Sequence, residues 1–318
     1  MTPCLLALDF GGTKHTAACF VSGESSWRSH RRANARPGSD AALDLEVMFR
    51  LARDVLAGQS PQAVGVSFGG PVDYSRGLVR LSHHVPGWEN IPLADLVSTE
   101  FNAPTLVDND ANAAGLGEAL YGAGRGMRSL FYITVSTGVG GGWILDGKIW
   151  RGHESMAGEI GHTIVDPLGP LCLCGKRGCV ERLASGPYLA QDMRAILRRR
   201  PEAGTTIRKL IGNDLDRIDG AVIAKAAALG DQQAQDLISR AGAAIGTGIG
   251  NAANLINPHA FILGGGVTKA GPLFWDALRE NARRTALPEI HFTILQAELG
   301  DDAPLWGAAR LAALASLG

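Results

Sequence analysis

The sequence lacks the features that mark several classes of protein. No apolar run in its 318 residues is long enough to span a membrane. The first residues, MTPCLLALDF, contain no basic segment, and their apolar run is too short for a signal peptide. Thirty basic and 31 acidic residues give a formal net charge of −1 without a basic stripe, which argues against a nucleic-acid surface. We therefore expect a cytoplasmic protein that binds neither membrane nor nucleic acid.

Cysteine is scarce, and most of it is concentrated in one place. Of five cysteines, three lie within eight positions: Cys172, Cys174 and Cys179. With His162 they form the set of three thiolates and one imidazole that is typical of a structural zinc site. Clustered cysteines can also form disulfides, but nothing else in the sequence indicates secretion, so we favour the metal.

The other two cysteines stand apart from this cluster. Cys4 and Cys19 lie in apolar surroundings near the N-terminus. Such positions are typical of buried thiols, which behave as small apolar side chains. We expect both to be buried and reduced.

Glycine, by contrast, is abundant, with 42 residues that gather in GG and GGG clusters at the ends of apolar runs. The run at Leu5–Asp9 is followed by GGT and then by loosely alternating residues, which predicts a strand, a tight turn and a second strand. The same arrangement recurs at Leu130–Ser136, where the sequence TGVGGG (137–142) follows.

Strands and helices alternate through the rest of the chain. The patterns predict strands near residues 63–67, 104–107, 259–263 and 290–295, and helices near 44–57, 93–100, 187–200, 220–229, 231–254, 272–285 and 304–317. Alternation of this kind indicates an α/β fold, and the glycine hairpins make its sheets mixed rather than parallel. We expect two lobes, residues 1–122 and 123–303, with the last helix, within 304–318, folding back on the first.

The glycine turns point to phosphate. Asp9 ends a strand directly before glycines whose N–H groups can face phosphate oxygens, and its carboxylate can hold Mg²⁺. Neither turn matches the Walker pattern or the GxGxxG pattern of a dinucleotide fold. A single turn would be weak support, but two in corresponding places, with a further GGG at 264–266, favour a nucleotide.

The sequence DNDAN (108–112) lies between a predicted strand and a predicted helix. Helix capping would account for one of its four acidic or amide residues but not for all of them. Asp110, at the start of the helix, is placed to accept a proton from a hydroxyl group. We therefore take Asp110 as the candidate general base.

Two glutamates flank the cysteine cluster. Glu159 precedes His162 by three residues, and Glu181 follows Cys179 by two. Either alone would be an ordinary solvated residue. Held by a metal loop, the pair suits neighbouring sugar hydroxyls, and His162 can bind metal through one ring nitrogen and a ligand through the other.

Together these residues resemble the ROK family of sugar kinases and their repressor relatives, over essentially the whole chain. The resemblance is carried by DFGGTK (9–14), GVSFGGPVD (65–73), VDNDANAAGLGE (107–118), STGVGGG (136–142), EIGHTIVDPLGPLCLCGKRGCVE (159–181), ERLASG (181–186) and LGGGV (263–267). It implies two actin-like, ribonuclease-H-like lobes around an interdomain cleft. One departure stands out, because relatives often have Asn before LPGW and this chain has His84 before VPGW.

The resemblance also implies a set of site residues. The catalytic base would be Asp110, and the zinc-binding loop would span 162–179 with ligands His162, Cys172, Cys174 and Cys179. The sugar contacts would be Gly70, Asn109, Asp110, Glu159, His162 and Glu181. The ATP contacts would be Asp9, Gly11, Gly12, Thr13, Lys14, Thr137, Gly138, Gly140, Gly264, Gly265 and Gly266.

The function expected from this resemblance is phosphorylation of a hexose at its 6-hydroxyl with ATP and Mg²⁺, in a homodimer with one structural zinc per chain. Glucose is the first choice, and N-acetylmannosamine or N-acetylglucosamine the alternative. A sugar-responsive repressor is disfavoured because DFGGT begins at residue 9, which leaves no room for a helix-turn-helix. An inactive sugar-binding module is disfavoured because Asp110 and both turns are intact. Because the phosphate turns at Gly11–Thr13 and Thr137–Gly138 do not need Glu181, we expect Glu181→Gln to weaken sugar binding more than ATP binding.

Overall fold

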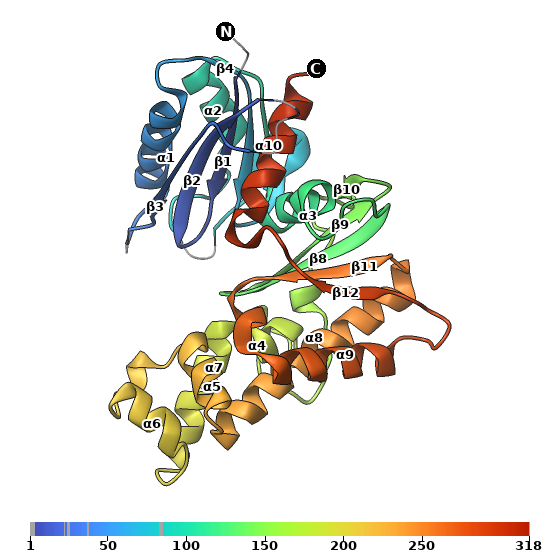
Figure 1. The fold of residues 1–318 in the computed structure, drawn as a ribbon. Helices are drawn as coiled ribbons and strands as arrows, with labels where there is room; N and C mark the ends of the chain where they lie inside the picture. Colours follow the sequence, from blue (N-terminus) through green and yellow to red (C-terminus); the bar gives the residue numbers. More distant parts are fainter. Residues whose placement is uncertain (1–3, 22, 24–25, 37, 83–84, 318) are drawn as a thin grey trace. The chain divides into compact units, whose positions relative to one another are not determined.

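The chain divides into two compact units, seen in a computed structural model that describes residues 4–21, 23, 26–36, 38–82 and 85–317 (Figure 1). Unit 1 holds residues 1–132, 142–157 and 297–318, and unit 2 holds residues 133–141 and 158–296. This division differs from the expected lobes at residues 123–132, 142–157 and 297–303, which belong to unit 1 and not to unit 2. The last helix belongs to unit 1.

Unit 1 is built on a five-stranded mixed sheet with the order β3-β2-β1-β4-β7. Its strands are β1 (Cys4–Phe10), β2 (Lys14–Phe20), β3 (Ser29–Asn34), β4 (Pro61–Phe68) and β7 (Thr105–Asn109). β2 pairs antiparallel with β1 and β3, while β4 pairs parallel with β1 and β7. The predicted hairpin around the first glycines is therefore present, with Asp9 opposite Thr16.

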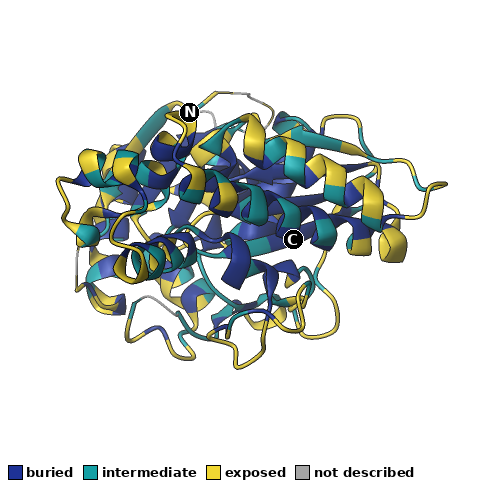
Figure 2. Cartoon of the chain, turned by 90° about the horizontal axis from the view of Figure 1, so that it is seen from below, coloured by how far each residue is buried: buried dark blue, intermediate teal, exposed yellow. Residues whose placement is uncertain are grey.

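Both faces of this sheet are buried. On β1, Leu6 and Leu8 face a core formed with α1 (Ala41–Leu56) and α2 (Leu93–Phe101), whereas Leu5 and Ala7 face α10 (Ala303–Ala315). Successive side chains of a strand point to opposite faces, so a strand buried on both sides is apolar throughout. Figure 1 shows α1 and α10 on opposite sides of the sheet, and Figure 2 shows the strands buried under helices with exposed outer faces.

Small residues allow α10 to lie close to its neighbours. A Cβ atom added to Gly65 of β4 would lie 1.9 Å from the Ala308 carbonyl oxygen, and one added to Gly307 would lie 1.8 Å from the Ala113 carbonyl oxygen. Ala113 belongs to α3 (Asp110–Tyr121). Any larger side chain at these glycines would push the last helix away from the sheet and from α3.

Glu118 fixes the chain that leads into α10. It is fully buried, and its carboxylate accepts hydrogen bonds from the backbone N–H groups of Ala123 (2.9 Å), Glu298 (3.2 Å) and Leu299 (2.8 Å). Three such bonds satisfy a buried charge that would otherwise be costly. α3, which begins at the candidate base, is thereby tied to the C-terminal segment.

Unit 2 is mostly helical. Its helices are α4 (Val180–Ala184), α5 (Gly186–Arg199), α6 (Thr205–Ile211), α7 (Gly220–Ala228), α8 (Gln232–Ile256) and α9 (Pro272–Thr285). The long helix α8 packs on α4, α7 and α9. Asp231 caps it by accepting a hydrogen bond from the Ala234 N–H.

A second five-stranded sheet has the order β10-β9-β8-β11-β12. Its strands are β8 (Ser129–Val135), β9 (Val139–Leu145), β10 (Lys148–Trp150), β11 (Ala260–Gly264) and β12 (Thr293–Gln296). A small hairpin joins β5 (Val72–Asp73) to β6 (Leu78–Val79). Single 3₁₀ turns occur at η1 (Tyr74–Arg76), η2 (Ile160–His162), η3 (Leu215–Arg217), η4 (Gly266–Ala270) and η5 (Gly300–Asp302).

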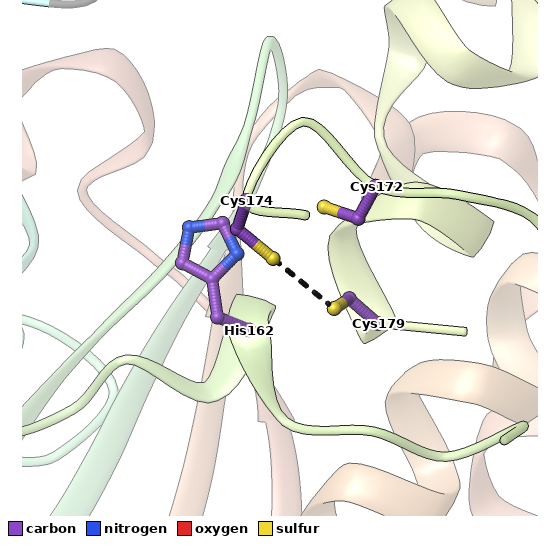
Figure 3. A group of neighbouring side chains, drawn as sticks. All are labelled: His162, Cys172, Cys174 and Cys179. Carbon is purple, nitrogen blue, oxygen red and sulfur yellow. Dashed lines mark hydrogen bonds between the residues drawn. The ribbon is translucent and has the colours of Figure 1, made fainter. Parts of the chain in front are cut away.

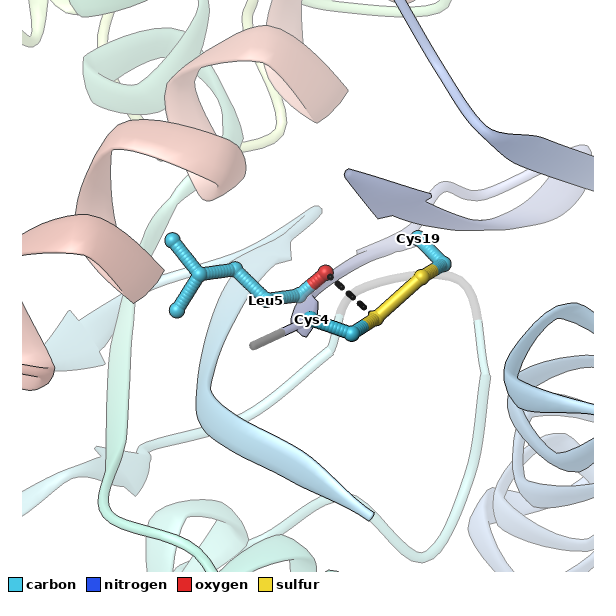
Figure 4. Close-up of a disulfide and its surroundings, with 3 residues drawn as sticks. All are labelled: Cys4, Leu5 and Cys19. Carbon is cyan, nitrogen blue, oxygen red and sulfur yellow. Dashed lines mark hydrogen bonds between the residues drawn. A yellow bond between two sulfur atoms is a disulfide. The ribbon is translucent and has the colours of Figure 1, made fainter. Parts of the chain in front are cut away.

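The two N-terminal cysteines are buried, as expected, but they are not separate thiols. Cys4 of β1 and Cys19 of β2 form a disulfide (Figure 4). Their Cα atoms lie 6.3 Å apart, because the hairpin sets β1 beside β2, and this separation is within the range that a disulfide spans. The expectation that both remain free is therefore wrong for this structure.

Within the described part of the chain, none of the helices combines the length and the apolar character that crossing a membrane requires.

Candidate active site

The first glycine turn (residues 11–13) carries a buried carboxylate. β1 brings Asp9 to the turn, where the side chain is 5% exposed and its Oδ1 accepts a hydrogen bond from the Ser67 hydroxyl at 2.8 Å. Burial raises the pKa of Asp9 to about 7; the Ser67 bond lowers it and the nearby Asp110 carboxylate raises it further. A cation bound beside Asp9 would stabilise the ionised carboxylate and so oppose the rise in pKa that burial causes.

Asn109 and Asp110 stand at the start of α3. Asn109 caps the helix, with its side-chain oxygen accepting from the N–H groups of Ala111 (2.9 Å) and Asn112 (3.3 Å). Its amide nitrogen donates to the Gly70 carbonyl oxygen at 3.0 Å. The structure thus brings together two of the predicted sugar contacts, Asn109 and Gly70.

Asp110 lies beside the first glycine turn. A Cβ atom added to Gly69 would lie 3.7 Å from both the Asp110 Oδ2 and the Gly12 nitrogen. Gly69 itself donates its N–H to the Phe10 carbonyl oxygen at 2.9 Å. The candidate base and the amide of the turn therefore meet around Gly69, and the Asp9 carboxylate lies next to Gly11 of the same turn, 3.9 Å from the position of an added Cβ atom.

Arg151 supports this site, although no sequence motif pointed to it. Its Nε donates to Asp108 Oδ2 at 2.7 Å, and its guanidinium lies 3.4 Å from the centre of the Tyr74 ring. Asp108 Oδ1 accepts from the Asn112 side chain at 2.9 Å and from the Asn109 N–H at 2.8 Å. Burial raises the pKa of Asp108, and the Arg151 charge opposes that rise. Asp108 is thus a structural member of DNDAN, holding the turn that presents the next two residues.

Lys14, expected to contact ATP, has a protein partner here. Its ammonium group forms an ion pair with Asp301 in η5, at the start of the C-terminal helix. The neighbouring Asp302 pairs with Arg32 of β3. Two acidic residues of the C-terminal segment therefore face two cations next to the first turn.

The second glycine turn (residues 136–138) opens onto a cavity of about 680 Å³ within unit 2. Thr137 and Gly266 line it together, so the structure brings two of the predicted nucleotide segments to one place. The starts of α5 and α7 add Gly186 and Asp219 to the lining. Gly265, with a φ of +94° and Val135 backbone within 2.4 Å of its Cβ position, requires glycine.

Glu181 contacts this turn directly. Its Oε2 accepts a hydrogen bond from the Val139 N–H at 3.0 Å. The second turn, which we expected not to need Glu181, therefore has this carboxylate as a direct neighbour. Glu159 lies at the N-terminal end of η2, exposed, and its carbonyl oxygen accepts from the His162 N–H at 3.1 Å.

The Cys/His loop (residues 162–179) gathers the four predicted metal ligands. The candidate ligand atoms of His162, Cys172, Cys174 and Cys179 all lie within 4.8 Å of one another (Figure 3). The sulfurs of Cys174 and Cys179 are 3.6 Å apart. Two thiolates bound tetrahedrally at about 2.3 Å would be separated by about 3.7 Å, so this spacing fits zinc.

Two further observations on the same loop support a metal. The Nδ1 atom of His162 is buried without a hydrogen-bond partner among the described residues. The N–H of Lys176 and the neighbouring thiols lower the pKa of Cys174 to about 7, whereas burial and those thiols raise the pKa of Cys179 to about 12. A bound cation would satisfy the imidazole and stabilise every thiolate.

The loop is shaped by its own backbone. The N–H of Cys172 bonds the Lys176 carbonyl oxygen at 2.8 Å, and the N–H of Gly175 bonds the Cys172 carbonyl oxygen at 3.0 Å. These bonds form the tight turn that places Cys172 and Cys174 on the same side. His84, at which the sequence departs from the family pattern, lies outside the described residues.

Several known proteins resemble this chain over nearly its whole length. Residues 5–314 match the model of the ROK family. A glucokinase of Streptomyces coelicolor is 34% identical over 96% of both chains, and an N-acetylmannosamine kinase of Salmonella typhi is 32% identical over 96% of this chain and 97% of its own. A crystal structure of a ROK family glucokinase from Streptomyces griseus, in complex with glucose and AMPPNP, superposes with a TM-score of 0.84 at 35% identity, covering 98% and 99% of the two chains. The chain belongs to the ROK family.

Proposed function

We propose that this protein is an ATP-dependent hexose kinase that transfers the γ-phosphoryl group to the 6-hydroxyl of glucose. The observation that carries this proposal is the meeting of Asp110 and the Gly12 amide around Gly69, with the Asp9 carboxylate close enough to feel the Asp110 charge. Phosphoryl transfer needs a base beside the acceptor hydroxyl, donors for the phosphate oxygens and a place for a cation. These three elements are adjacent here.

In the proposed reaction Asp110 accepts the proton of the 6-hydroxyl while the hydroxyl oxygen of the sugar forms a bond to the γ-phosphorus. The bond from that phosphorus to the β-γ bridging oxygen breaks, and ADP leaves with the electron pair. Asp9 would hold Mg²⁺, which neutralises phosphate charge when bound. The amides of the two glycine turns orient the phosphates, and the cavity lined by Thr137, Gly186 and Gly266 receives the adenosine.

The remaining predicted residues take supporting roles. We assign the sugar contacts implied by the family resemblance to Gly70, Asn109, Glu159, His162 and Glu181. His162, Cys172, Cys174 and Cys179 hold one zinc ion, which fixes the loop and performs no chemistry on the substrate. The convergence of the four ligand atoms supports this assignment.

Glucose is preferred because glucokinases of Streptomyces coelicolor and Thermotoga maritima are 34% and 30% identical to this chain. The N-acetylmannosamine kinase of Salmonella typhi, at 32%, keeps that sugar as the second candidate. We also propose a cytoplasmic homodimer, on the family resemblance, and light scattering of the purified protein tests the dimer.

A panel of hexoses tests the function. The purified protein with ATP and Mg²⁺ is given glucose, mannose, N-acetylmannosamine and N-acetylglucosamine, and ADP release is followed by a coupled assay. We expect the highest kcat/KM with glucose. A higher value with N-acetylmannosamine would replace glucose by the second candidate, and no sugar-dependent ADP release from any hexose would reject the kinase assignment.

A further inference from the structure

Val139, the first residue of β9, is held from two sides by the segments that flank the Cys/His loop. On one side Glu181 Oε2 accepts its N–H at 3.0 Å. On the other, Gly161 packs so closely that a Cβ atom there would lie 2.1 Å from the Val139 carbonyl oxygen. Val139 is buried and directly follows the second glycine turn, so its position sets the direction of the turn's amides.

Glu181 is itself firmly placed. It lies in the first turn of α4, between Val180, whose N–H bonds the Thr163 carbonyl oxygen at 3.0 Å, and Arg182. Arg182 forms two hydrogen bonds with Asp192 of α5, at 3.1 and 2.7 Å. These neighbours fix the backbone of α4 from which the Glu181 side chain reaches the turn.

The turn is also shaped to receive this carboxylate. A Cβ atom added to Gly138 would lie 2.9 Å from Glu181 Oε2, so a larger residue would displace the carboxylate. The absence of a side chain at Gly138 therefore serves the contact with Glu181 as well as any approach of phosphate.

We propose that Glu181 positions the second glycine turn for phosphate binding, and that its one carboxylate couples nucleotide affinity to sugar affinity. This inference rests on the proposed kinase function. A carboxylate has two oxygens: Oε2 accepts the Val139 N–H, and our proposal assigns the second, Oε1, to a sugar hydroxyl. Sugar binding would then fix the side chain that orders the turn, and nucleotide binding would fix the side chain that receives the sugar.

Linkage makes this coupling measurable, because a factor by which sugar raises nucleotide affinity must equal the factor by which nucleotide raises sugar affinity. The two functions of the carboxylate can be separated by substitution. In Glu181→Gln the side-chain amide keeps an oxygen that accepts the Val139 N–H but loses the charge offered to the sugar. In Glu181→Ala the N–H has no acceptor.

The test is calorimetric titration of the ATP analogue AMPPNP into the full-length wild type and both variants, with and without glucose. Without sugar, we expect Glu181→Gln to bind AMPPNP within about threefold of the wild type and Glu181→Ala to bind about tenfold more weakly. Glucose should raise AMPPNP affinity in the wild type and not in Glu181→Ala. Zinc content, measured on each sample, separates loss of the contact from loss of the Cys/His loop.

Equal sugar-free AMPPNP affinity in the wild type and Glu181→Ala would overturn the proposal, as would an equal loss in both variants with zinc retained. If Glu181→Ala loses zinc, Glu181→Asp takes its place, because it keeps the charge but is one methylene shorter. Hydrogen exchange of the Val139 amide should be slow in the wild type and in Glu181→Gln, and it should be faster in Glu181→Asp. Titration without sugar needs no turnover, so failure to phosphorylate any hexose would reject the kinase function without deciding the role of Glu181.

Discussion

The two glycine hairpins of this chain look alike in sequence but differ in where each obtains its carboxylate. The first, between β1 and β2, has Asp9 on its own leading strand, buried and hydrogen-bonded to Ser67. The second, between β8 and β9, receives Glu181 from a helix more than forty residues later in the chain.

The difference indicates a division of work between the hairpins. Asp9 bonds a hydroxyl group and sits close to Asp110, an arrangement that suits a cation. Glu181 bonds a backbone amide, which fixes the turn and removes that oxygen from any cation. Similar turns therefore serve different functions, because the carboxylate beside each one has a different partner.

Removing the base should have the largest effect. In Asp110→Asn the side chain keeps its shape and an acceptor oxygen but cannot take a proton, so we expect kcat to fall by about 10²–10⁴ while glucose affinity changes little. Steady-state kinetics and glucose titration measure both quantities. Asp95→Asn, the same change on an exposed position of α2, should be unaffected and serves as control. Near-normal turnover in Asp110→Asn would refute the assignment.

Removing a metal ligand should disorder the Cys/His loop and with it Glu181, the residue that bonds the second hairpin. Cys174→Ala leaves three ligands, and we expect zinc, measured by elemental analysis, to fall from one per chain to near zero. Zinc affinity should fall by more than the roughly 10–100-fold that is typical when a residue supporting a metal ligand, rather than a ligand itself, is replaced. Activity should fall as well, since Glu181 follows the ligand Cys179 by two residues. Leu173→Ala changes a neighbouring side chain that is 92% exposed and should retain the metal. Wild-type protein that contains no zinc would contradict the proposed site.

How far the sequence predicted this site depends on the distance between partners along the chain. The hairpins and the gathering of the four candidate ligands were predictable because glycine clusters follow apolar runs and the thiols lie within eight positions. The mixed α/β fold followed from the alternation of apolar patterns, and the helices expected at 231–254 and 272–285 are present as α8 and α9, although α8 extends two residues further, to Ile256.

The interactions that distinguish the two hairpins were not predictable, because they join residues far apart. Arg151 binds Asp108 across 43 positions, and Glu181 binds Val139 across 42. The helix α4 was missed because five residues are too few to show periodicity. β12 was expected from residue 290 but begins at Thr293.

A third experiment concerns the charge of Asp9. Its pKa is raised from 3.8 to about 7, so between these values the folded protein keeps a proton that the unfolded chain has lost. The resulting stability is present below about pH 4 and is lost as the pH rises through 7. Asp9→Asn removes this dependence, and its free energy of unfolding relative to the wild type should rise by on the order of 1–4 kcal/mol between pH 4 and 8 without Mg²⁺.

Denaturant unfolding of both proteins across this pH range, in the presence of a chelator, measures the difference. Mg²⁺ should then stabilise the wild type more at pH 8 than at pH 5 and should not stabilise the variant. Parallel pH profiles for the wild type and Asp9→Asn would show that this carboxyl group titrates normally.

The smallest effect is expected at the ion pair between Lys14 and Asp301. Both side chains are partly exposed, at 29% and 56%, so the pair should contribute less than about 1 kcal/mol to stability. It nevertheless engages the cation proposed to meet ATP. Asp301→Asn should release Lys14 and tighten sugar-free AMPPNP binding by about two- to fivefold, an effect that fades as salt is raised. Asp302→Asn removes the same charge from the adjacent position, where the partner is Arg32. If Asp302→Asn tightens AMPPNP binding as much as Asp301→Asn does, the gain comes from the lower negative charge of the segment as a whole, and Lys14 has no special part in holding the phosphates.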